Sequence, residues 1–318
     1  MEYSTFGHTD LNPSVIGFGC GRIASVSALN DRKEIVATLH EALDKGINFF
    51  DTADIYGQGD SERLLGSVFR GQRHRLLLCS KAGYTFGTGR YIPRWLKPLA
   101  KRVVRRWKSA RTAATAVRGR SQRQDFTPAH IRAAVEGSLR RLGTEHLDIF
   151  LLHCPPVEVV ANGTALETLV RLKECGLVRY YGVSCATTAD ALACLRYPGI
   201  SVLQIAVNFL ETEAINKALP LAIERKAAIV AREPFAQGRL LTDRRLIDRL
   251  GKNPSRTPAQ TALRFVMQLR GVGVVLPGMT SRVHLEENTG ALLAPPLTSE
   301  EMGMLRAATR PNDEEASR

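Results

Sequence analysis

Several features that mark whole classes of protein are missing from this sequence of 318 residues. No stretch approaches the roughly 20 uninterrupted apolar residues of a membrane-spanning helix, so we expect no transmembrane segment. Residues 1–7 lack the basic start and apolar core of a signal peptide. The six cysteines include no C-x-x-C pair, and we therefore expect reduced thiols in a cytoplasmic protein.

Motifs for several kinds of chemistry are also absent. No serine or cysteine lies in a nucleophile motif, and no group of histidines and carboxylates has the spacing of metal ligands. No G-x-G-x-x-G follows a strand-like run and opens a helix, which argues against a Rossmann domain. We therefore expect no bound metal and disfavour a metal-dependent hydrolase.

Acidic residues are absent from one long segment, residues 84–124, which we call the cationic segment. The whole chain has 44 Lys and Arg against 31 Asp and Glu, a net charge of +13, and twelve of the basic residues lie in this segment. The rest of the chain is close to neutral. The charge imbalance thus belongs to one segment and not to the whole surface.

Eight short apolar runs recur along the chain, each too brief for a helix and apolar on both faces, as buried parallel strands are. They occupy residues 15–18, 47–50, 76–79, 148–152, 179–183, 202–205, 227–230 and 272–276. Helical patterns separate them, some opened by the pair Thr-Pro, as at Thr127 and Thr257. Eight strands with intervening helices predict a (β/α)8 TIM barrel over residues 1–318, with a β-hairpin at residues 3–15 and a tail at residues 310–318.

Polar residues stand at the ends of these runs, where the active site of such a barrel lies. They are Asp51 with Tyr56 five residues later, Lys81, His153, Ser184, Gln204 on the sixth run, and Arg232. Singly, each has an ordinary structural explanation. Together, a Tyr hydroxyl near a Lys that is paired with an Asp predicts a proton donor, because the cation lowers the phenol pKa from about 10. A neighbouring His can polarise a carbonyl oxygen.

The motifs around these residues follow one another in the order of a known family. They are FFDTADIYG at 49–57, GDSE at 59–62, LG at 65–66, CSKAG at 79–83, SLRRL at 138–142, DIFLLH at 148–153, GVS at 182–184, PG at 277–278 and EEN at 286–288. This set resembles the aldo-keto reductase superfamily. The resemblance runs from the N-terminal hairpin to about residue 308, apart from the cationic segment.

The resemblance implies reduction of a small-molecule aldehyde or ketone to an alcohol by hydride transfer from NADPH, with NADH possible. It implies a catalytic tetrad of Asp51, Tyr56, Lys81 and His153, with Tyr56 as the proton donor. The implied cofactor-binding residues are Gly19, Cys20, Asp51, Ser184, Cys185, Gln204, Arg232, Phe235, Gln237, Gly238, Gly278, Met279, Thr280, Arg282, Glu287 and Asn288. The implied substrate residues are Ile55, Tyr84 and Trp95.

Four positions depart from the family pattern. Cys185 stands where Asn is usual, and Arg232 stands where many members have an aromatic ring on the nicotinamide. Gly278 and His284 occupy positions where many members have the Lys and Arg that bind the 2′-phosphate of NADPH. We expect Arg282, the permanently charged cation of this stretch, to provide that selectivity instead.

Two other functions fit the same family. One is an NAD(P)-dependent dehydrogenase that oxidises a sugar or an alcohol, which the preference between NADPH and NADH would distinguish. The other is a non-catalytic cofactor-binding regulatory subunit, against which the intact tetrad argues. Turnover of any aldehyde would separate an enzyme from such a subunit.

The cationic segment carries a helical pattern of its own. Trp95, Leu99, Val103 and Trp107 recur at every fourth residue, with basic residues on the other faces. One interpretation is a helix packed on the barrel with a solvated basic face. The other is a lid that meets an anionic or carrier-bound substrate, or an acidic surface contacting residues 90–120. Nucleic acid has no support beyond charge, and neither nucleic acid nor a membrane is firmly indicated.

Overall fold

The computed structural model describes residues 1–24, 31–86 and 122–307 of the chain. The helix expected around Trp95, the role of Trp95 at the substrate, most of the cationic segment and the tail at 310–318 lie outside the described residues. Among the residues that are described, none of the helices combines the length and the apolar character needed to cross a bilayer.

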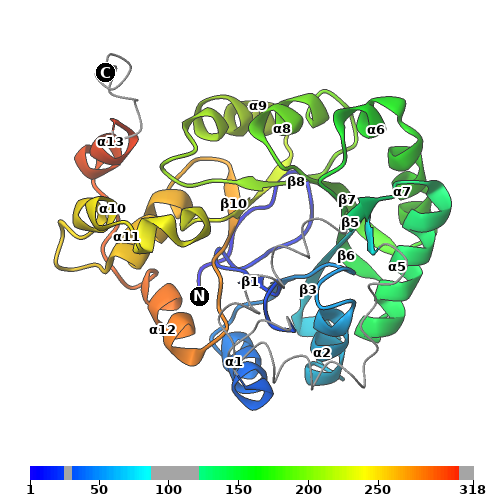
Figure 1. Ribbon diagram of the computed structural model, residues 1–318, viewed down its shortest axis with the longest axis horizontal. Coiled ribbons are helices and arrows are strands. Elements are labelled where there is room, and N and C mark those ends of the chain that lie inside the picture. Colours follow the sequence, from blue (N-terminus) through cyan, green and yellow to red (C-terminus); the bar gives the residue numbers. More distant parts are fainter. Residues whose placement is uncertain (25–30, 87–121, 308–318) are drawn as a thin grey trace.

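Eight parallel strands form the barrel that the apolar runs predicted (Figure 1). In order around the barrel they are β1 (Phe18–Gly19), β2 (Phe49–Asp51), β3 (Leu77–Ala82), β6 (Leu147–His153), β7 (Val178–Ser184), β8 (Val202–Ala206), β9 (Ala228–Arg232) and β10 (Val272–Leu276). Parallel bridges join Ile16 to Val275 and Gly19 to Gly278, which brings the first strand beside the last. Each expected run overlaps one of these strands, so the predicted fold is confirmed.

Helices surround the sheet and occur in every link between successive barrel strands (Figure 1). The α-helices are α1 (Arg32–Asp44), α2 (Asp60–Val68), α5 (Pro128–Leu142), α6 (Val157–Asn162), α7 (Thr164–Glu174), α8 (Thr188–Cys194), α9 (Leu219–Glu224), α10 (Arg244–Leu250), α11 (Pro258–Met267), α12 (Arg282–Gly290) and α13 (Ser299–Ala307). Shorter helical turns are η1 (Arg73–Arg75), η2 (Ala214–Ala218) and η3 (Ala236–Leu241). The threonines before α5 and α11 cap these helices as expected: the Thr127 side chain accepts from the His130 amide, and Thr257 forms a capping box.

The N-terminal hairpin closes one end of the barrel. Tyr3 and Ser14 form an antiparallel bridge, and the turn between them carries Phe6 into the barrel, where its side chain is fully buried. The Phe6 ring packs edge-on against Phe49 at the start of β2, with ring centres 6.1 Å apart. The amino-terminal end of the sheet is thus filled with apolar side chains, which leaves the other end for polar residues.

Alternation along the strands places the expected site residues. Successive side chains of a strand point to opposite faces, so every second residue points into the barrel. Phe49 and Cys79 belong to the inner apolar cluster, and Asp51 and Lys81 follow them by two residues. The same offset gives His153 after Leu151, Gln204 after Val202 and Arg232 after Val230. The two-residue alternation that points apolar side chains into the barrel therefore also points polar side chains inward at the carboxyl ends of the strands.

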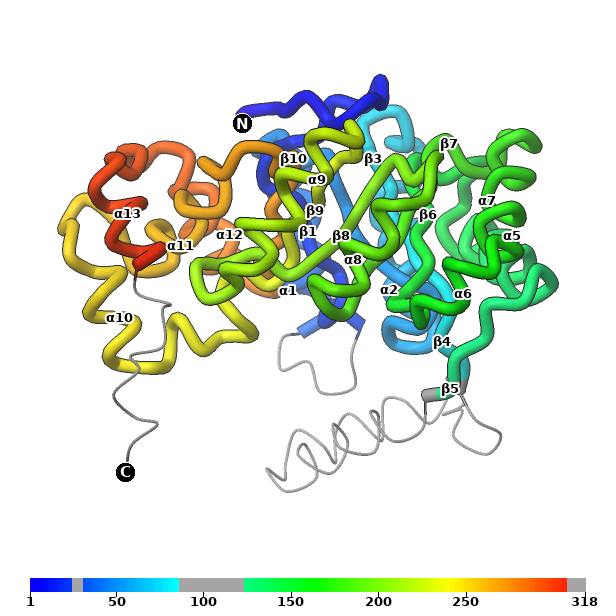
Figure 2. The backbone as a smooth tube through the Cα atoms, turned by 90° about the horizontal axis from the view of Figure 1, so that it is seen from above, coloured from blue at the N-terminus to red at the C-terminus, as the bar shows by residue number. Residues whose placement is uncertain are grey.

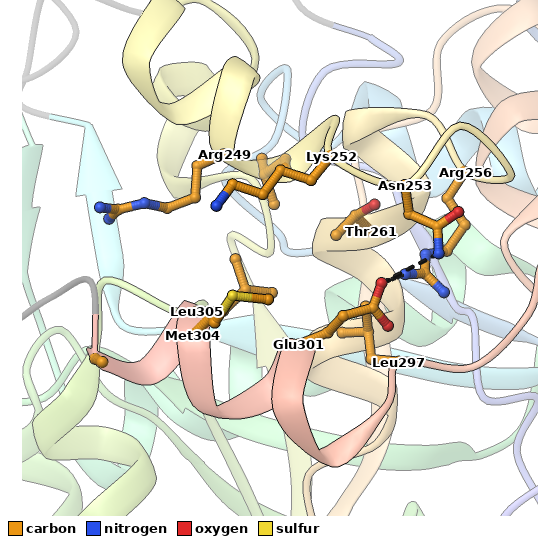
Figure 3. A pocket seen from close by; sticks show the side chains of 11 residues that line it. Arg249, Lys252, Asn253, Arg256, Thr261, Leu297, Glu301, Met304 and Leu305 are labelled. Carbon is orange, nitrogen blue, oxygen red and sulfur yellow. Dashed lines mark hydrogen bonds and ion pairs between the residues drawn. The ribbon is translucent and has the colours of Figure 1, made fainter.

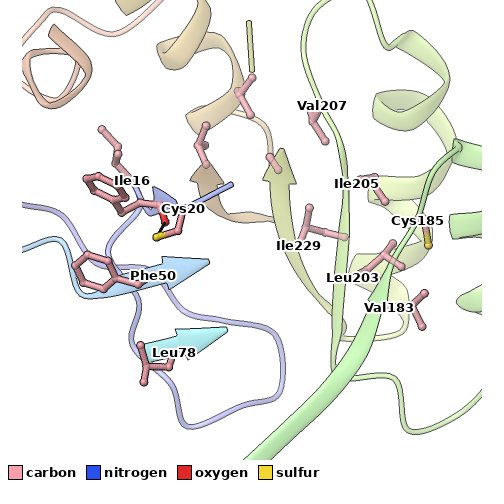
Figure 4. Packing of buried hydrophobic residues seen from close by; sticks show 14 of the residues in the cluster. Ile16, Cys20, Phe50, Leu78, Val183, Cys185, Leu203, Ile205, Val207 and Ile229 are labelled. Atoms are coloured by element: carbon pink, nitrogen blue, oxygen red, sulfur yellow. Dashed lines mark hydrogen bonds between the residues drawn. The ribbon is translucent and has the colours of Figure 1, made fainter. Parts of the chain in front are cut away.

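A second apolar layer lies between the strands and the helices. Figure 4 shows outward-facing residues of neighbouring strands packed in this layer, among them Phe50, Leu78 and Ile229. Burying one such side chain contributes about 1.5–3 kcal/mol of transfer free energy. Gly182 is required in β7, because a Cβ atom there would lie 1.7 Å from the Val202 carbonyl oxygen. The backbones of β7 and β8 therefore approach closely at this point.

The two ends of the cationic segment lie outside the helix expected around Trp95 and form short strands. Residues Tyr84–Phe86 (β4) and Gln122–Gln124 (β5) form a separate two-stranded antiparallel sheet, with Tyr84 opposite Gln124. Figure 2 shows this ribbon on the side of the barrel away from the N-terminus. Because β4 follows β3 after a single residue, the ribbon stands directly beside the carboxyl ends of the strands.

Candidate active site

A buried ion pair lies at the floor of the site. The Lys81 Nζ donates to both carboxylate oxygens of Asp51 at 2.7 Å and to the Thr52 carbonyl oxygen at 2.8 Å. Burial by itself lowers the pKa of Lys81, but the negative groups of Asp51 and Tyr56 outweigh it and raise the pKa above its usual value. Lys81 is therefore a permanent cation inside the barrel.

Tyr56 lies next to this cation. The Lys81 Nζ is 5.3 Å from the centre of the Tyr56 ring. The Tyr56 amide donates to the Ala53 carbonyl oxygen at 3.1 Å, which folds the β2–α2 loop back over the strand end. Gly57 follows with φ at 59°, and a Cβ atom there would lie 2.8 Å from the Ala24 carbonyl oxygen. This tight turn fixes the position of the tyrosine.

His153, at the end of β6, stands between two tyrosines. Its ring is edge-on to Tyr56, with centres 5.9 Å apart, and edge-on to Tyr84, with centres 5.0 Å apart. The next residue, Cys154, has φ at 53°, a left-handed conformation that is uncommon for a side chain other than glycine. The Gln124 Nε2 donates to the Cys154 carbonyl oxygen at 2.8 Å and holds this turn from the ribbon.

A hydrogen-bonded chain connects the expected nicotinamide residues to the tetrad. The Ser184 Oγ donates to Gln204 Oε1 at 3.0 Å, and Gln204 Nε2 donates to Asp51 Oδ1 at 2.8 Å. All three side chains are buried. Asp51 thus accepts from both Lys81 and Gln204, and its buried charge is compensated.

A cavity of about 450 Å³ opens above these groups, a size suited to a small-molecule site. Its lining comprises Tyr56, His153, Cys154, Ser184, Ala186, Thr187, Thr188, Gln204, Ile205, Ala206, Glu211, Arg232, Glu233 and Gln237. Ile55 and Tyr84, both expected at the substrate, do not line it in the part of the chain that the structure describes. Cys154, Thr187, Thr188 and Glu211 were missed, and their only signal in the sequence is that they follow barrel strands.

Of the two unusual residues expected at the cofactor, Arg232 lines the cavity, and Cys185 is buried. The Arg232 guanidinium donates to the carbonyl oxygens of Cys185 and Ala186, at 2.8 and 3.2 Å. It also forms an ion pair with Glu233, which neutralises a carboxylate that would otherwise repel a pyrophosphate. Glu233 and Gln237 both have φ near 57°, so the loop after β9 holds strained backbone beside the cavity, as functional loops often do.

The expected adenosine end lies across the barrel mouth. Gly19 is bridged to Gly278, and a Cβ atom at Gly278 would meet nothing within 4 Å, so the space above it is open. Cys20 and Met279, which were also expected at the cofactor, are fully buried. Arg282, the first residue of α12, forms an ion pair with Glu41 at 2.8 Å.

The remaining expected cofactor residues lie in the loop after β9 and in α12. Phe235 packs partly buried against the outer apolar layer, and Gly238 follows Gln237 in the loop after β9. The Asn288 Nδ2 donates to the Gly278 carbonyl oxygen at 3.5 Å, and Glu287 accepts from the Thr257 hydroxyl at 3.1 Å. A polar pair at the cavity floor and an open backbone at Gly278 fit a nicotinamide dinucleotide. In the described part of the chain, no group of three or more His, Cys, Asp or Glu could hold a metal.

Comparison with known proteins decides the family. The model of the Aldo/keto reductase family matches residues 15–310. The chain belongs to the aldo-keto reductase family. Its relatives include an uncharacterized oxidoreductase, YqkF, of Bacillus subtilis, 26% identical over 98% of this chain and 97% of that protein.

Solved structures of aldo-keto reductases share the fold of this chain. AKR11C1 from Bacillus halodurans in its holo form has a TM-score of 0.79 at 26% identity, covering 98% of this chain and 97% of that one. An aldo-keto reductase from Klebsiella pneumoniae in complex with NADPH has a TM-score of 0.69 at 25% identity, with coverage of 98% and 97%. The family expected from the sequence motifs is thereby confirmed, and with it an oxidoreductase.

Proposed function

We propose that this aldo-keto reductase reduces an aldehyde or ketone to an alcohol with NADPH, and that Tyr56 donates the proton. The observation that carries the proposal is the meeting of Tyr56 and His153 at one cavity, with the Lys81 cation 5.3 Å from the Tyr56 ring. The NADPH complex of the relative from Klebsiella pneumoniae supports the choice of cofactor. The six free cysteines support a reducing, cytoplasmic location.

The residues of the site act on the oxygen of the substrate. Tyr56 transfers its hydroxyl proton to the carbonyl oxygen as negative charge develops there. The phenol oxygen then carries the charge, which the buried Lys81 cation stabilises while Asp51 holds Lys81 in place. His153 orients the carbonyl oxygen, and a preorganised donor of this kind is worth about 3 kcal/mol of barrier lowering.

The nicotinamide cofactor, when bound, supplies the hydride. We assign the Ser184 hydroxyl and the Gln204 amide to its carboxamide, because these polar groups lie at the cavity floor. The loop with Phe235, Gln237 and Gly238 faces the mouth and would hold the pyrophosphate. Residues 278–288, which include Arg282, would hold the adenosine end.

The role of Tyr56 is tested by Tyr56→Phe. We expect kcat to fall by about 10²–10⁴-fold, because the hydroxyl proton is lost, while the NADPH dissociation constant stays unchanged. Lys81→Met should lower kcat similarly, since the charge on the phenol oxygen then has no cation beside it. Steady-state kinetics and fluorescence titration measure the two quantities. A phenylalanine variant that keeps most of its turnover would remove Tyr56 from the mechanism.

The direction of the reaction is the main alternative. The same residues could catalyse the reverse reaction, in which a sugar or another alcohol is oxidised with NAD⁺, because each proton transfer is reversible. The preference between NADPH and NADH distinguishes the two directions. A cofactor-depletion screen over aldehydes, ketones and sugars, run with both cofactors, measures that preference. Turnover of any carbonyl compound would also exclude a purely regulatory subunit.

We also propose that the substrate is anionic or carrier-bound. The support for this is the composition of the cationic segment, which holds twelve basic residues and no acid and begins directly after β3. An anionic or carrier-bound substrate should then show a kcat/KM that falls steeply as ionic strength rises. A neutral aldehyde of similar size serves as the control. Equal salt dependence for the two substrates would contradict this part.

A further inference from the structure

Two Arg–Glu ion pairs of this chain border cavities, and they differ in their access to a ligand. One of them, between Arg256 and Glu301, borders a cavity of about 330 Å³ between α10, α11 and α13 (Figure 3). The Arg256 side chain is 1% exposed and also donates to the carbonyl oxygens of Pro295 and Pro296. This pair joins α13 to the chain before α11, which is a structural role.

The other pair, between Arg232 and Glu233, lies at the active site. Both residues line the active-site cavity together with Tyr56 and His153. Their side chains are 22% and 30% exposed, so each keeps accessible surface. The Gln237 Nε2 also donates to the Glu233 carboxylate at 3.1 Å. A ligand in the cavity therefore meets a fixed cation and a fixed anion.

The Arg232 side chain reaches across the end of the neighbouring strand. Arg232 is the last residue of β9, and its guanidinium donates to the carbonyl oxygens of Cys185 and Ala186, which follow β7. Because β8 lies between β9 and β7 in the sheet, the side chain crosses the carboxyl end of β8, the strand that holds Gln204. We assigned Ser184 and Gln204 to the nicotinamide carboxamide. The cation thus lies on the side of the cavity assigned to the nicotinamide.

The charge of Arg232 acts inside the cavity. Burial raises the pKa of the Cys154 thiol, and the Arg232 cation is the strongest influence that lowers it. Cys154 lines the cavity and follows His153 in the chain. The other charged residues among the described lining are Glu233 and Glu211. Glu211 is exposed, so water weakens its field, and the pair of Arg232 and Glu233 dominates the local potential.

The two forms of the cofactor differ in charge at the nicotinamide ring, which is neutral in NADPH and positive in NADP⁺. Their phosphates are the same. A cation beside the ring repels NADP⁺ but not NADPH, and a carboxylate has the reverse effect. We propose that the pair of Arg232 and Glu233 sets the relative affinity of the site for the reduced and the oxidised cofactor. Arg232 disfavours NADP⁺, and Glu233 limits this effect. The inference rests on the proposed function for the place of the nicotinamide ring.

Calorimetric titration of the full chain with NADPH and with NADP⁺ tests the inference. The quantity of interest is the dissociation constant for NADP⁺ divided by that for NADPH. Arg232→Gln leaves Glu233 without its cation, and we expect this ratio to fall about tenfold, the lower end of the effect of a neighbouring charge on a titration. Glu233→Gln leaves Arg232 without its anion, and the ratio should rise by a similar factor. If Arg232→Gln does not fold, the direction of the change in Glu233→Gln decides.

Two further variants separate charge from structure. Arg232→Lys keeps the cation but loses the geometry of the guanidinium hydrogen bonds, so the ratio should stay close to that of the unmodified protein while both affinities fall. Glu301→Gln breaks the ion pair of Figure 3, which shares no lining residue with the active-site cavity. It should leave the ratio unchanged, whatever its effect on the unfolding temperature. Thermal unfolding of each variant gives that temperature.

Opposite shifts in the two glutamine variants are the mark of a charge effect, because a purely structural pair would lose affinity for both cofactor forms in both variants. Ratios that stay unchanged, or that move in the same direction in Arg232→Gln and Glu233→Gln, overturn the inference and leave the proposed function intact. A ratio in Arg232→Lys that equals the one in Arg232→Gln also overturns it. An unmodified protein that binds neither NADPH nor NADP⁺ overturns the inference and the proposed function together.

Discussion

The ring of Tyr84 stands edge-on to the ring of His153, with the two centres 5.0 Å apart and the planes at 84°. Tyr84 pairs with Gln124 across the β4–β5 ribbon, and Gln124 holds the carbonyl oxygen of Cys154. The first and last residues of the cationic segment thus contact His153 and the turn that follows it. The ribbon acts as a support for His153.

This support is tested by Gln124→Ala. We expect kcat/KM to fall about fivefold, mainly through a higher KM, because the loss of one hydrogen bond of about 1 kcal/mol frees the turn at Cys154 and loosens the orientation of the substrate oxygen. The measurement is steady-state kinetics with a saturating cofactor. Arg123→Ala, one residue away on the same exposed strand, is the matched control and should leave KM unchanged. The same KM in both variants would show that the ribbon does not position His153.

The placement of Lys81 and His153 could be predicted from the sequence because it follows from local rules. Lys81 follows Cys79 by two residues, and His153 follows Leu151 by two, so strand period alone sets both side chains inside the barrel. The bond from Gln124 to Cys154 could not be predicted in this way. It depends on a left-handed turn and on the pairing of two strands that lie far apart in the chain.

The contacts of the expected cofactor residues could not be predicted from the sequence either. The sequence marked Arg232 and Cys185 as departures from the family, but not that the arginine donates to the carbonyl oxygen of that cysteine. Arg282 was expected to select the 2′-phosphate, and only the structure shows Glu41 on α1 beside it. Contacts between distant elements depend on the tertiary arrangement, which no local pattern records. Substrate identity is equally hidden, because loops of different strands build the cavity.

The pair of Arg282 and Glu41 makes a prediction about cofactor selectivity. The Arg282 side chain is 62% exposed and is held by Glu41 at 2.8 Å. Glu41→Gln removes the competing charge, and since such a surface pair is worth up to about 1 kcal/mol, NADPH should bind up to about fivefold tighter. NADH lacks the 2′-phosphate and should bind unchanged. Fluorescence titration with both cofactors gives the ratio.

The reverse change supplies the control for that experiment. Arg282→Ala should weaken NADPH far more than NADH, because only the 2′-phosphate loses its cation. An equal loss for both cofactors would assign the selectivity to His284 or to a residue of another loop. The effect should also shrink as salt is added, since the pair and the phosphate are both near solvent.

Asp54, two residues before Tyr56, is a partly buried acid with a raised pKa. Its Oδ1 is buried and has no hydrogen-bond partner among the described residues. Burial, and then the charge of Glu62, raise the pKa of Asp54 from 3.8 to about 7. Arg141 opposes this shift only partly, because its Nε already donates to Glu62 at 2.6 Å. Lys81 and the Ile55 amide lower the pKa by less.

This raised pKa makes stability fall as pH rises. Below pH 3.8 the Asp54 carboxyl is protonated in both the folded and the unfolded chain, and between pH 3.8 and about 7 only the unfolded chain releases the proton. The folded state thus loses on the order of 4 kcal/mol between those limits. Asp54→Asn removes the ionisation, so its stability advantage over the unmodified protein should grow from pH 5 to pH 8 in urea unfolding. Asp44→Asn, at an exposed carboxylate, should leave that slope unchanged, and parallel slopes for all three proteins would contradict the assignment.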